Sequence, residues 1–349
     1  MKKISVIIPE EPSDILDRMI KAAVGDYETE IIKNVDNIPY LTNKRILFAI
    51  ELDDAGNNIN LSRLFSTLYK RGKEALKGST GAILVHSNSE LFTKTVAQEV
   101  VFKANQLGCS FPGRPLVEAT GALRNLLTMQ KVIKKPLEEV CCILCEKLGK
   151  RLITDAPKLL KDPQLLVLHA SNRETSNTLM LWDMIKRNLD GYKINEIHIE
   201  NGTVRDCIGC PYKTCKHYGE STSCFYGGIM VEEVYPAVLD ADAIIWICPN
   251  YNDAVSSNIS AVINRLTALF RKTKFYDKTL FGVIVSGNSG SDALAKQLIS
   301  ALNMNKTFRL PPYFSIMATA NDRNAILKVP GIEDKAKKFA ENMKREIKA

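Results

Sequence analysis

Four cysteines lie close together on one polar segment of this 349-residue chain. They are Cys207, Cys210, Cys215 and Cys224, and a glycine and a proline stand among them. Four closely spaced thiolates can reach one small metal centre, which is what a [4Fe–4S] cluster requires. Zinc would accept the same four thiolates, or three of them with His217. Two interpretations need no metal: unliganded thiols, or a C-x-x-C dithiol.

The other five of the nine cysteines lie in apolar segments. Cys142 and Cys145 form a second C-x-x-C, but they fall in an amphipathic helical pattern. Buried thiols behave as small apolar side chains, so we expect this pair to pack in a core. The sequence therefore offers one candidate metal segment.

A second candidate site is a hydroxyl-rich loop between an apolar run, LLVLHA, and a helical pattern, LMLWDMIKRNL. Free backbone N–H groups and the helix dipole favour an anion at such a helix start. Serine and threonine hydroxyls would add donors, and an arginine would add positive charge. Plain helix capping is the alternative, because the same residue types cap helices without any ligand. The candidate phosphate-binding residues are Ser171, Arg173, Thr175, Ser176, Asn177 and Thr178.

Two further loops follow apolar runs that are typical of buried strands. In doubly wound sheets the ligand lies outside the carboxyl ends of the strands, at the point where the strand order reverses. Tyr251 could cover a planar ring there, and the small residues around Gly287 would allow close backbone approach. An ordinary rim aromatic and an ordinary turn are the alternatives. The candidate residues are Pro249, Asn250, Tyr251 and Asn252 in one loop, and Ser286, Gly287, Asn288 and Ser289 in the other.

Apolar runs and amphipathic stretches alternate along the whole chain, which predicts an α/β fold with parallel sheets. The pattern also repeats: ILFAIELDD from Ile46 aligns with IIWICPNYND from Ile244, and GAILVHSNS from Gly81 aligns with FGVIVSGNS from Phe281. We therefore predict two tandem, doubly wound parallel-sheet domains, over residues 1–153 and 163–349, and the family resemblance described below implies that they are flavodoxin-like. The second copy carries a cysteine-rich insertion at about 201–232.

The two predicted copies differ where a ligand would bind. The first copy has Glu10 and Glu11 at the phosphate position, and carboxylates repel a phosphate. It also has Leu52 and two aspartates in place of the Pro-x-Tyr loop. We expect this copy to be degenerate, to bind no cofactor, and to act as a built-in second subunit.

The run S-x-R-x-x-S-N-T, then C-x-G-C, then P-x-Y and a small-residue loop resembles the NADPH-dependent FMN reductase and iron–sulfur flavoprotein family, over residues 164–312. The resemblance implies a flavodoxin-like fold that binds flavin mononucleotide (FMN). It implies a compact cysteine motif for a cluster, although four residues here separate the second and third cysteines where two are usual. It implies phosphate contacts from Ser171, Arg173, Ser176, Asn177 and Thr178, and ring contacts from Pro249, Asn250, Tyr251 and the loop around Gly287.

These features predict an FMN-dependent oxidoreductase. NAD(P)H or a ferredoxin-like protein would reduce the flavin, and electrons would pass to a small-molecule or protein acceptor, through a [4Fe–4S] cluster if one is present. We find no catalytic acid–base pair. The alternative is a non-catalytic flavin-binding or zinc-stabilised scaffold. The resemblance suggests an intrachain pseudo-dimer, with a homo-oligomer also open.

Charge and hydropathy exclude several other classes. The net charge is +8, with 47 basic and 39 acidic residues interleaved along the chain. This distribution favours solvated faces over a nucleic-acid surface. The first apolar run ends at Pro9, too early for a signal peptide. No apolar stretch reaches the roughly 18 residues of a membrane helix, so we expect a cytoplasmic protein.

Overall fold

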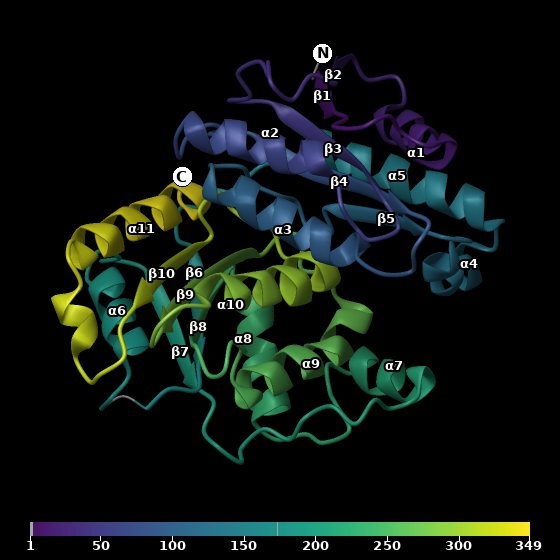
Figure 1. Ribbon diagram of the computed structural model, residues 1–349. Helices are drawn as coiled ribbons and strands as arrows, with labels where there is room; N and C mark the ends of the chain where they lie inside the picture. The colour runs from purple at the N-terminus through teal and green to yellow at the C-terminus, as the bar shows by residue number, and fades with distance from the viewer. Residues whose placement is uncertain (1–2, 173) are drawn as a thin grey trace. The chain divides into compact units, whose positions relative to one another are not determined.

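The computed structural model of the protein describes residues 3–172 and 174–349. The chain divides into two compact units, Met1–Ala156 and Pro157–Ala349. The predicted domain limits, residues 153 and 163, fall on either side of this division. Each unit is a parallel sheet covered by helices on both faces (Figure 1).

Unit 1, residues 1–156, contains a five-stranded parallel sheet in the order β2-β1-β3-β4-β5. Its strands are β1 (Ile4–Ile7), β2 (Thr29–Ile32), β3 (Arg45–Leu52), β4 (Thr80–Ser87) and β5 (Leu116–Thr120). Its helices are α1 (Asp14–Val24), α2 (Ile59–Lys70), α3 (Thr93–Gln106), η1 (Arg124–Leu126), α4 (Leu127–Ile133) and α5 (Leu137–Thr154). This is the flavodoxin strand order.

Unit 2, residues 157–349, has the same order in its own numbering, β7-β6-β8-β9-β10. Its strands are β6 (Gln164–His169), β7 (Lys193–His198), β8 (Ala243–Pro249), β9 (Thr279–Ser286) and β10 (Ser315–Thr319). Its helices are α6 (Asn177–Lys186), α7 (Tyr212–Glu220), α8 (Tyr235–Asp240), α9 (Ser257–Lys272), α10 (Ser291–Leu298) and α11 (Ile332–Ile347), with short segments η2 (Met230–Val234), η3 (Ile299–Met304) and η4 (Ala325–Lys328).

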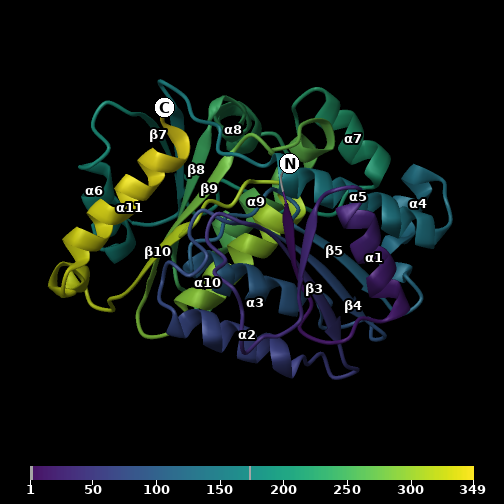
Figure 2. The ribbon, with the colours of Figure 1, turned by 90° about the horizontal axis from the view of Figure 1, so that it is seen from above.

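The central strands are apolar on both faces because helices cover both faces of each sheet. Every residue of β4 and of β9 is buried. In unit 2, α6 and α11 lie on one face and α9 and α10 on the other (Figure 2). Trp182 of α6 and Trp246 of β8 are among the largest fully buried side chains, and they anchor the two faces of this core.

In each unit, the strand that precedes the small-residue loop ends in the same backbone hydrogen bond. These strands are β4 in unit 1 and β9 in unit 2. Ser87 accepts from the Gly121 amide, and Ser286 accepts from the Ala320 amide, each at 2.9 Å. Ser87 and Ser286 are therefore equivalent positions. The alignment of Gly81 with Phe281 is wrong by one residue, because aligning the Asn-Ser pairs of the two loops shifted the strand.

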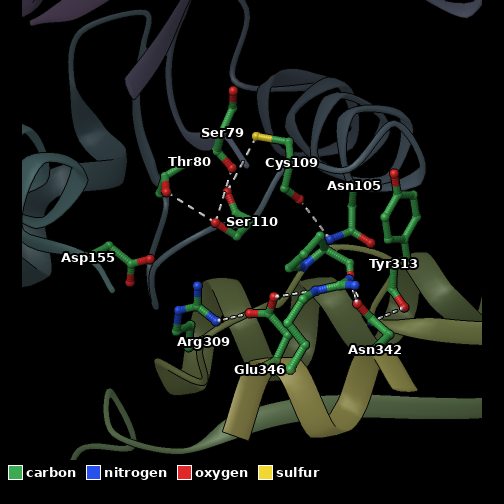
Figure 3. A network of polar contacts seen from close by, with 12 residues as sticks. Ser79, Thr80, Asn105, Cys109, Ser110, Asp155, Arg309, Tyr313, Asn342 and Glu346 are labelled. Carbon is green, nitrogen blue, oxygen red and sulfur yellow. Dashed lines mark hydrogen bonds and ion pairs between the residues drawn. The ribbon is translucent and has the colours of Figure 1, made fainter. Parts of the chain in front are cut away.

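The turn after α3 in unit 1 and the turn after η3 in unit 2 are also built alike. Asn105 donates to the Cys109 carbonyl at 3.0 Å in unit 1 (Figure 3), and Asn303 donates to the Phe308 carbonyl at 2.8 Å in unit 2. Unit 2 adds a buried ion pair after this turn, with Arg309 Nη1 lying 3.1 Å from Glu346 Oε2 (Figure 3).

The units differ most between their second and third strands. In unit 1, residues 33–44 make this connection without a helix, whereas in unit 2 residues 199–242 contain α7, η2 and α8. The four clustered cysteines lie on this longer connection. No helix in the described part of the chain is both long and apolar enough to cross a membrane.

Candidate FMN site and cysteine loop

The candidate site of unit 2 begins at the carboxyl end of β6. Ser171 is buried, with 1% of its surface exposed, and its hydroxyl has no hydrogen-bond partner among the described residues. Leaving a buried hydroxyl unpaired is unfavourable. This hydroxyl therefore fits a ligand oxygen at the start of α6. Arg173, the predicted cationic contact, lies outside the described residues.

Ser176 caps α6 as well as belonging to the predicted phosphate loop. Its side chain accepts a hydrogen bond from the Leu179 amide at 3.2 Å. The loop is further shaped by Asn172, whose side chain accepts from the Glu174 amide at 2.8 Å. The capping interpretation is thus correct for Ser176, and a cap leaves the other amides of the first turn free for an anion.

Asn177 joins the phosphate loop to the loop after β10. Its side chain donates to the Asp322 carbonyl at 2.8 Å and accepts from the Ile326 amide at 3.2 Å. The side chain is therefore committed to positioning a neighbouring loop. Thr178 is buried beside it, whereas Thr175 is exposed at the loop surface.

The predicted aromatic, Tyr251, stands on a tight turn at the end of β8. Asn252 and Asp253 both have positive φ, 53° and 55°, which is the pattern of a type I′ turn. The Ala254 amide donates to the Tyr251 carbonyl at 3.1 Å and closes the turn. Gln297 of α10 braces it by donating to the Asp253 carbonyl at 2.8 Å. Tyr251 is 56% exposed, so its ring is available to a ligand.

Asn250 connects the loop after β8 with the loop after β9. These are the two loops predicted to border the flavin ring, and they are called the ring-side loops below. Asn250 Nδ2 lies 3.1 Å from Ser286 Oγ and donates to the Ser289 carbonyl at 3.2 Å. Its Oδ1 is buried and has no donor within the described structure. An acceptor of this kind fits a ligand N–H at the rim of the site. Pro249, half-buried at the end of β8, fixes the backbone just before it.

The loop after β9 lies close to the loops that follow β8 and β10. A Cβ added at Gly287 would lie 2.7 Å from Asn321 Oδ1, so the Asn321 side chain would have to shift to admit it. Gly290 has a φ of 92°, in the region that glycine adopts most readily. Ser286 Oγ contacts Ser291 Oγ at 2.7 Å, which pins the loop to α10. Asn288 and Ser289 are exposed.

These two loops and the loop after β10 enclose a polar pocket of about 460 Å³. Its lining residues are Asn250, Asn252, Asp253, Gly287, Asn288 and Asn321. Sequence reasoning missed Asn321, and the polar run after the fifth strand of unit 2 was the available signal. The structure thus brings the two predicted ring-side loops together at one edge.

A larger pocket of about 640 Å³ lies beside the carboxyl end of α6 and the start of β7. Parallel strands begin at the edge opposite to the one where they end, so this pocket is not part of the candidate site. The smaller pocket is the relevant one, because it lies where doubly wound sheets bind ligands.

Residues 163–322 match the family model of NADPH-dependent FMN reductases. This match lies within unit 2, which is called the FMN reductase unit below, and it supports a flavin-dependent NAD(P)H oxidoreductase as the activity class. The match extends past the predicted limit at residue 312 and includes Asn321.

Several solved structures resemble the chain. A NAD(P)H:quinone oxidoreductase from Methanothermobacter marburgensis is 12% identical, with a TM-score of 0.38 over 52% of this chain and 98% of that one. An azoreductase from Bacillus anthracis is 13% identical, with a TM-score of 0.39 over 51% of this chain and 98% of that one. No curated protein matches the chain significantly in sequence.

The cysteine loop is the segment of about residues 201–232 that carries the four clustered cysteines. Its helix α7 packs against α9. Cys207 is exposed, and Cys210, Cys215 and Cys224 are half-buried. In residues 3–172 and 174–349 no three His, Cys, Asp or Glu side chains are placed to hold a metal ion, so the predicted metal centre stays a prediction. Cys207 and Cys210 lie on a stretch without helix or strand, whereas Cys215 lies on α7.

The second C-x-x-C behaves as a packing element. Cys145 is fully buried, and it belongs with Cys141 to the core beneath α1 and α5 of unit 1. A hydrogen bond with the Cys141 side chain, together with burial, raises the pKa of the Cys145 thiol far above its ordinary value. Cys142 is half-buried at the edge of the same core.

The corresponding edge of unit 1 is occupied by its own side chains. His86 Nδ1 contacts both Glu51 Oε1 and, at 3.0 Å, Ser13 Oγ, while the Ser13 amide donates to Glu51 Oε2 at 3.0 Å. Ser13 caps α1 as Ser176 caps α6. Glu10 and Glu11, the predicted obstacle, are exposed at the surface. The polar cluster of Ser13, Glu51 and His86 stands instead where the three strand ends meet.

Proposed function

We propose that unit 2 binds FMN at the carboxyl edge of β6, β8 and β9 and uses NAD(P)H to reduce it for an external electron acceptor. The family match carries the proposal, because it covers the loops after β6, β8 and β9 that hold the candidate residues. Two buried groups without partners in the described structure, the Ser171 hydroxyl and Asn250 Oδ1, support it, because each is free to pair with a ligand atom.

Different loops would contact different parts of the cofactor. The loop of Ser171, Arg173, Thr175, Ser176, Asn177 and Thr178 would hold the phosphate at the start of α6. Asn250, Asn252 and the backbone from Ser286 to Ser289 would border the flavin ring, and Tyr251 would cover it. When bound, FMN supplies the hydride and electron chemistry. The protein would hold and orient the ring, and the asparagines that line the polar pocket would offer it hydrogen-bonding groups.

Reduction of the bound flavin under anaerobic conditions tests this function. We expect NADPH or NADH to bleach the oxidised-flavin absorption band of the FMN-loaded protein, and a small electron acceptor to restore it over many cycles. A scaffold that only binds flavin would show no turnover. Stable binding of FMN without any reduction by either nucleotide would refute the oxidoreductase proposal.

We further propose that the cysteine loop holds a thiolate-bound metal centre, either a [4Fe–4S] cluster or zinc. A cluster would relay electrons, whereas zinc would not, because zinc has no redox chemistry. The donor chemistry fits, because four thiolates are a ligand set that both centres accept. Replacing Cys210 by serine should deplete the metal and leave FMN bound. Replacing Cys142 by serine should change neither the metal content nor the amount of bound FMN. Metal content that follows Cys142 would refute this assignment.

We also propose that the units arose by tandem duplication and that unit 1 substitutes for a second subunit. The shared strand order and the equivalent hydrogen bonds of Ser87 and Ser286 support a common origin. Unit 1 then binds no flavin, because the Ser13, Glu51 and His86 cluster occupies its strand ends.

A further inference from the structure

Asn250, directly after β8, is held in one orientation by its neighbours. Its backbone amide donates to the Val285 carbonyl at 2.9 Å, so the residue continues the pairing of β8 with β9. Its side-chain Nδ2 lies 3.0 Å from Asp253 Oδ1, 3.1 Å from Ser286 Oγ and 3.2 Å from the Ser289 carbonyl oxygen. The side chain therefore bridges the two ring-side loops and cannot rotate without breaking these contacts.

The chemistry of these neighbours decides which end of the Asn250 amide faces them. The nitrogen and the oxygen of an asparagine side chain have nearly the same size, and their hydrogen-bond partners tell them apart. A carboxylate and a backbone carbonyl accept hydrogen bonds and have none to donate, so Asp253 and Ser289 both require the N–H end. Exchanging the two ends would place Oδ1 against two acceptors. Asn250 Oδ1 is therefore the end directed away from these partners.

This fixed acceptor is available to a ligand. Asn250 Oδ1 is buried and is without a hydrogen-bond partner in residues 3–172 and 174–349. A buried carbonyl oxygen left unpaired costs free energy, and a donor brought by a ligand removes that cost. Asn250 also lines the polar pocket of about 460 Å³ at this edge of the sheet. A molecule in this pocket therefore meets an asparagine whose free hydrogen-bonding group is an acceptor.

The isoalloxazine ring of FMN carries two kinds of N–H group that such an acceptor could bind. The imide N–H of its pyrimidine ring, N3–H, lies between two carbonyl groups and is present in both oxidised and reduced flavin. The other, N5–H, forms only when the ring is reduced, and N5 of the oxidised ring is itself an acceptor. An amide that served N5 would have to turn over in every catalytic cycle. The fixed amide of Asn250 suits the donor that does not change.

We propose that Asn250 Oδ1 accepts the imide N–H of the flavin and makes this unit selective for flavins with an unsubstituted imide. The inference rests on the proposed FMN site and names the group that recognises the pyrimidine end of the ring. Asn288 of the same pocket suits the neighbouring imide carbonyl. Its Oδ1 already accepts from the Ser289 amide at 2.8 Å, so its Nδ2 is the end left to donate. Asn250 is a specificity-determining residue, and the hydride chemistry belongs to the flavin.

Binding of FMN and of 3-methyl-FMN tests the proposal, because the second flavin differs only by a methyl group in place of this hydrogen. The flavin-free wild-type chain and Asn250→Ala would each be titrated with both flavins, with flavin fluorescence as the readout. We expect wild type to bind 3-methyl-FMN at least about tenfold more weakly than FMN, because the methyl group leaves Oδ1 buried and unpaired. Asn250→Ala should bind the two flavins with nearly equal affinity, since it has no acceptor to leave unpaired.

Gln297→Ala is the matched control. Gln297 of α10 donates to the Asp253 carbonyl at 2.8 Å and accepts from the Val255 amide at 3.1 Å, so it braces the same turn through groups other than Asn250. Its removal should weaken the binding of both flavins by the same factor, and the preference for FMN should stay that of wild type. A preference lost in Asn250→Ala alone separates this hydrogen bond from a general loosening of the loop.

The midpoint potential of the bound flavin is a second readout. Because N3–H is present in both redox states, Asn250→Ala should weaken the binding of oxidised and reduced FMN equally and leave the potential unchanged. A shifted potential with unchanged affinity for oxidised FMN would overturn the proposal, because it would assign Oδ1 to N5–H. Equal affinity of wild type for FMN and 3-methyl-FMN would also overturn it, as would an undiminished preference for FMN in Asn250→Ala. A wild type that binds neither flavin would refute the FMN site itself, and this inference with it.

Discussion

Ser171 and Ser176 stand on the same loop, but their hydroxyls are in different situations. Ser176 already accepts a backbone hydrogen bond as the cap of α6, whereas the buried hydroxyl of Ser171 has no partner in the described structure. A group that is satisfied without a ligand contributes to folding, and one that is not satisfied is available for binding. The structure therefore assigns the cap to Ser176, and phosphate binding by Ser171 stays a prediction.

Replacing Ser171 by alanine should weaken FMN binding by about tenfold, because hydrogen bonds to charged groups contribute about 1.5–3 kcal/mol. The flavin-free protein should keep its stability. The companion variant Ser176→Ala should instead lose about 1 kcal/mol of unfolding free energy, as for other helix caps. Fluorescence titration with FMN and urea denaturation measure the two effects. Unchanged FMN affinity in Ser171→Ala would remove this hydroxyl from the site.

Glu51 gives unit 1 a pH-dependent stability. Burial alone would raise the pKa of Glu51, but hydrogen bonds from His86 and Ser13 outweigh burial and lower the pKa. A carboxyl with a lowered folded-state pKa stabilises the fold above its unfolded pKa, and this stabilisation is lost as the pH falls through the folded value.

We therefore expect the unfolding free energy of the wild type to fall as the pH drops below about 4.5, the unperturbed value. Glu51→Gln should show a shallower decline over the same range, since it has no carboxyl to protonate. Denaturation curves at a series of acidic pH values measure this. Parallel declines in both proteins would show that Glu51 does not contribute.

At the scale of elements, the order of strands and helices could be predicted from sequence, but the side chains at their ends could not. The buried runs of β3 and β8 are long and apolar, so their alignment from Ile46 and Ile244 agrees with the observed pairing of Ile46 and Ile244 with β1 and β6. Sequence could not show that Asn177 bonds to Asp322, because that contact joins residues far apart in the chain. Long-range side-chain contacts leave no periodic signal.

The crossing of α1 and α5 in unit 1 depends on one glycine. A Cβ at Gly149 would lie 1.7 Å from the Ala23 carbonyl oxygen, and that oxygen belongs to backbone that cannot swing away. Gly149→Ala should therefore destabilise unit 1 by about 1–3 kcal/mol, the usual range for overpacking. Lys150→Ala, at the exposed neighbouring position, should change stability by less than about 0.5 kcal/mol. Urea denaturation compares them, and equal stabilities would contradict the close crossing.

At the scale of the whole molecule, two units with one strand order carry different polar groups at their carboxyl edges. The FMN reductase unit leaves Ser171 and Asn250 with unpaired buried atoms, whereas unit 1 pairs Ser13, Glu51 and His86 Nδ1 with one another and leaves His86 Nε2 buried without a partner in the described structure. The sequence predicted a loss of flavin binding in unit 1 from Glu10 and Glu11, which lie at the surface, and this loss stays a prediction. The actual cluster was not predictable from spacing, since its members come from three separate strand ends.

Fully loaded protein should accordingly carry one FMN per chain. The Ser13, Glu51 and His86 cluster lies at the carboxyl edge of unit 1, and a phosphate there would face the Glu51 carboxylate, which is strongly repulsive where water is scarce. Equilibrium dialysis with FMN, together with flavin and protein quantitation, measures the ratio. The double variant Ser171→Ala, Asn250→Ala should bind less than one FMN at the same free concentration, and this locates the bound molecule in unit 2. Two FMN per chain in the wild type, or one that persists undiminished in the double variant, would show that unit 1 binds the flavin.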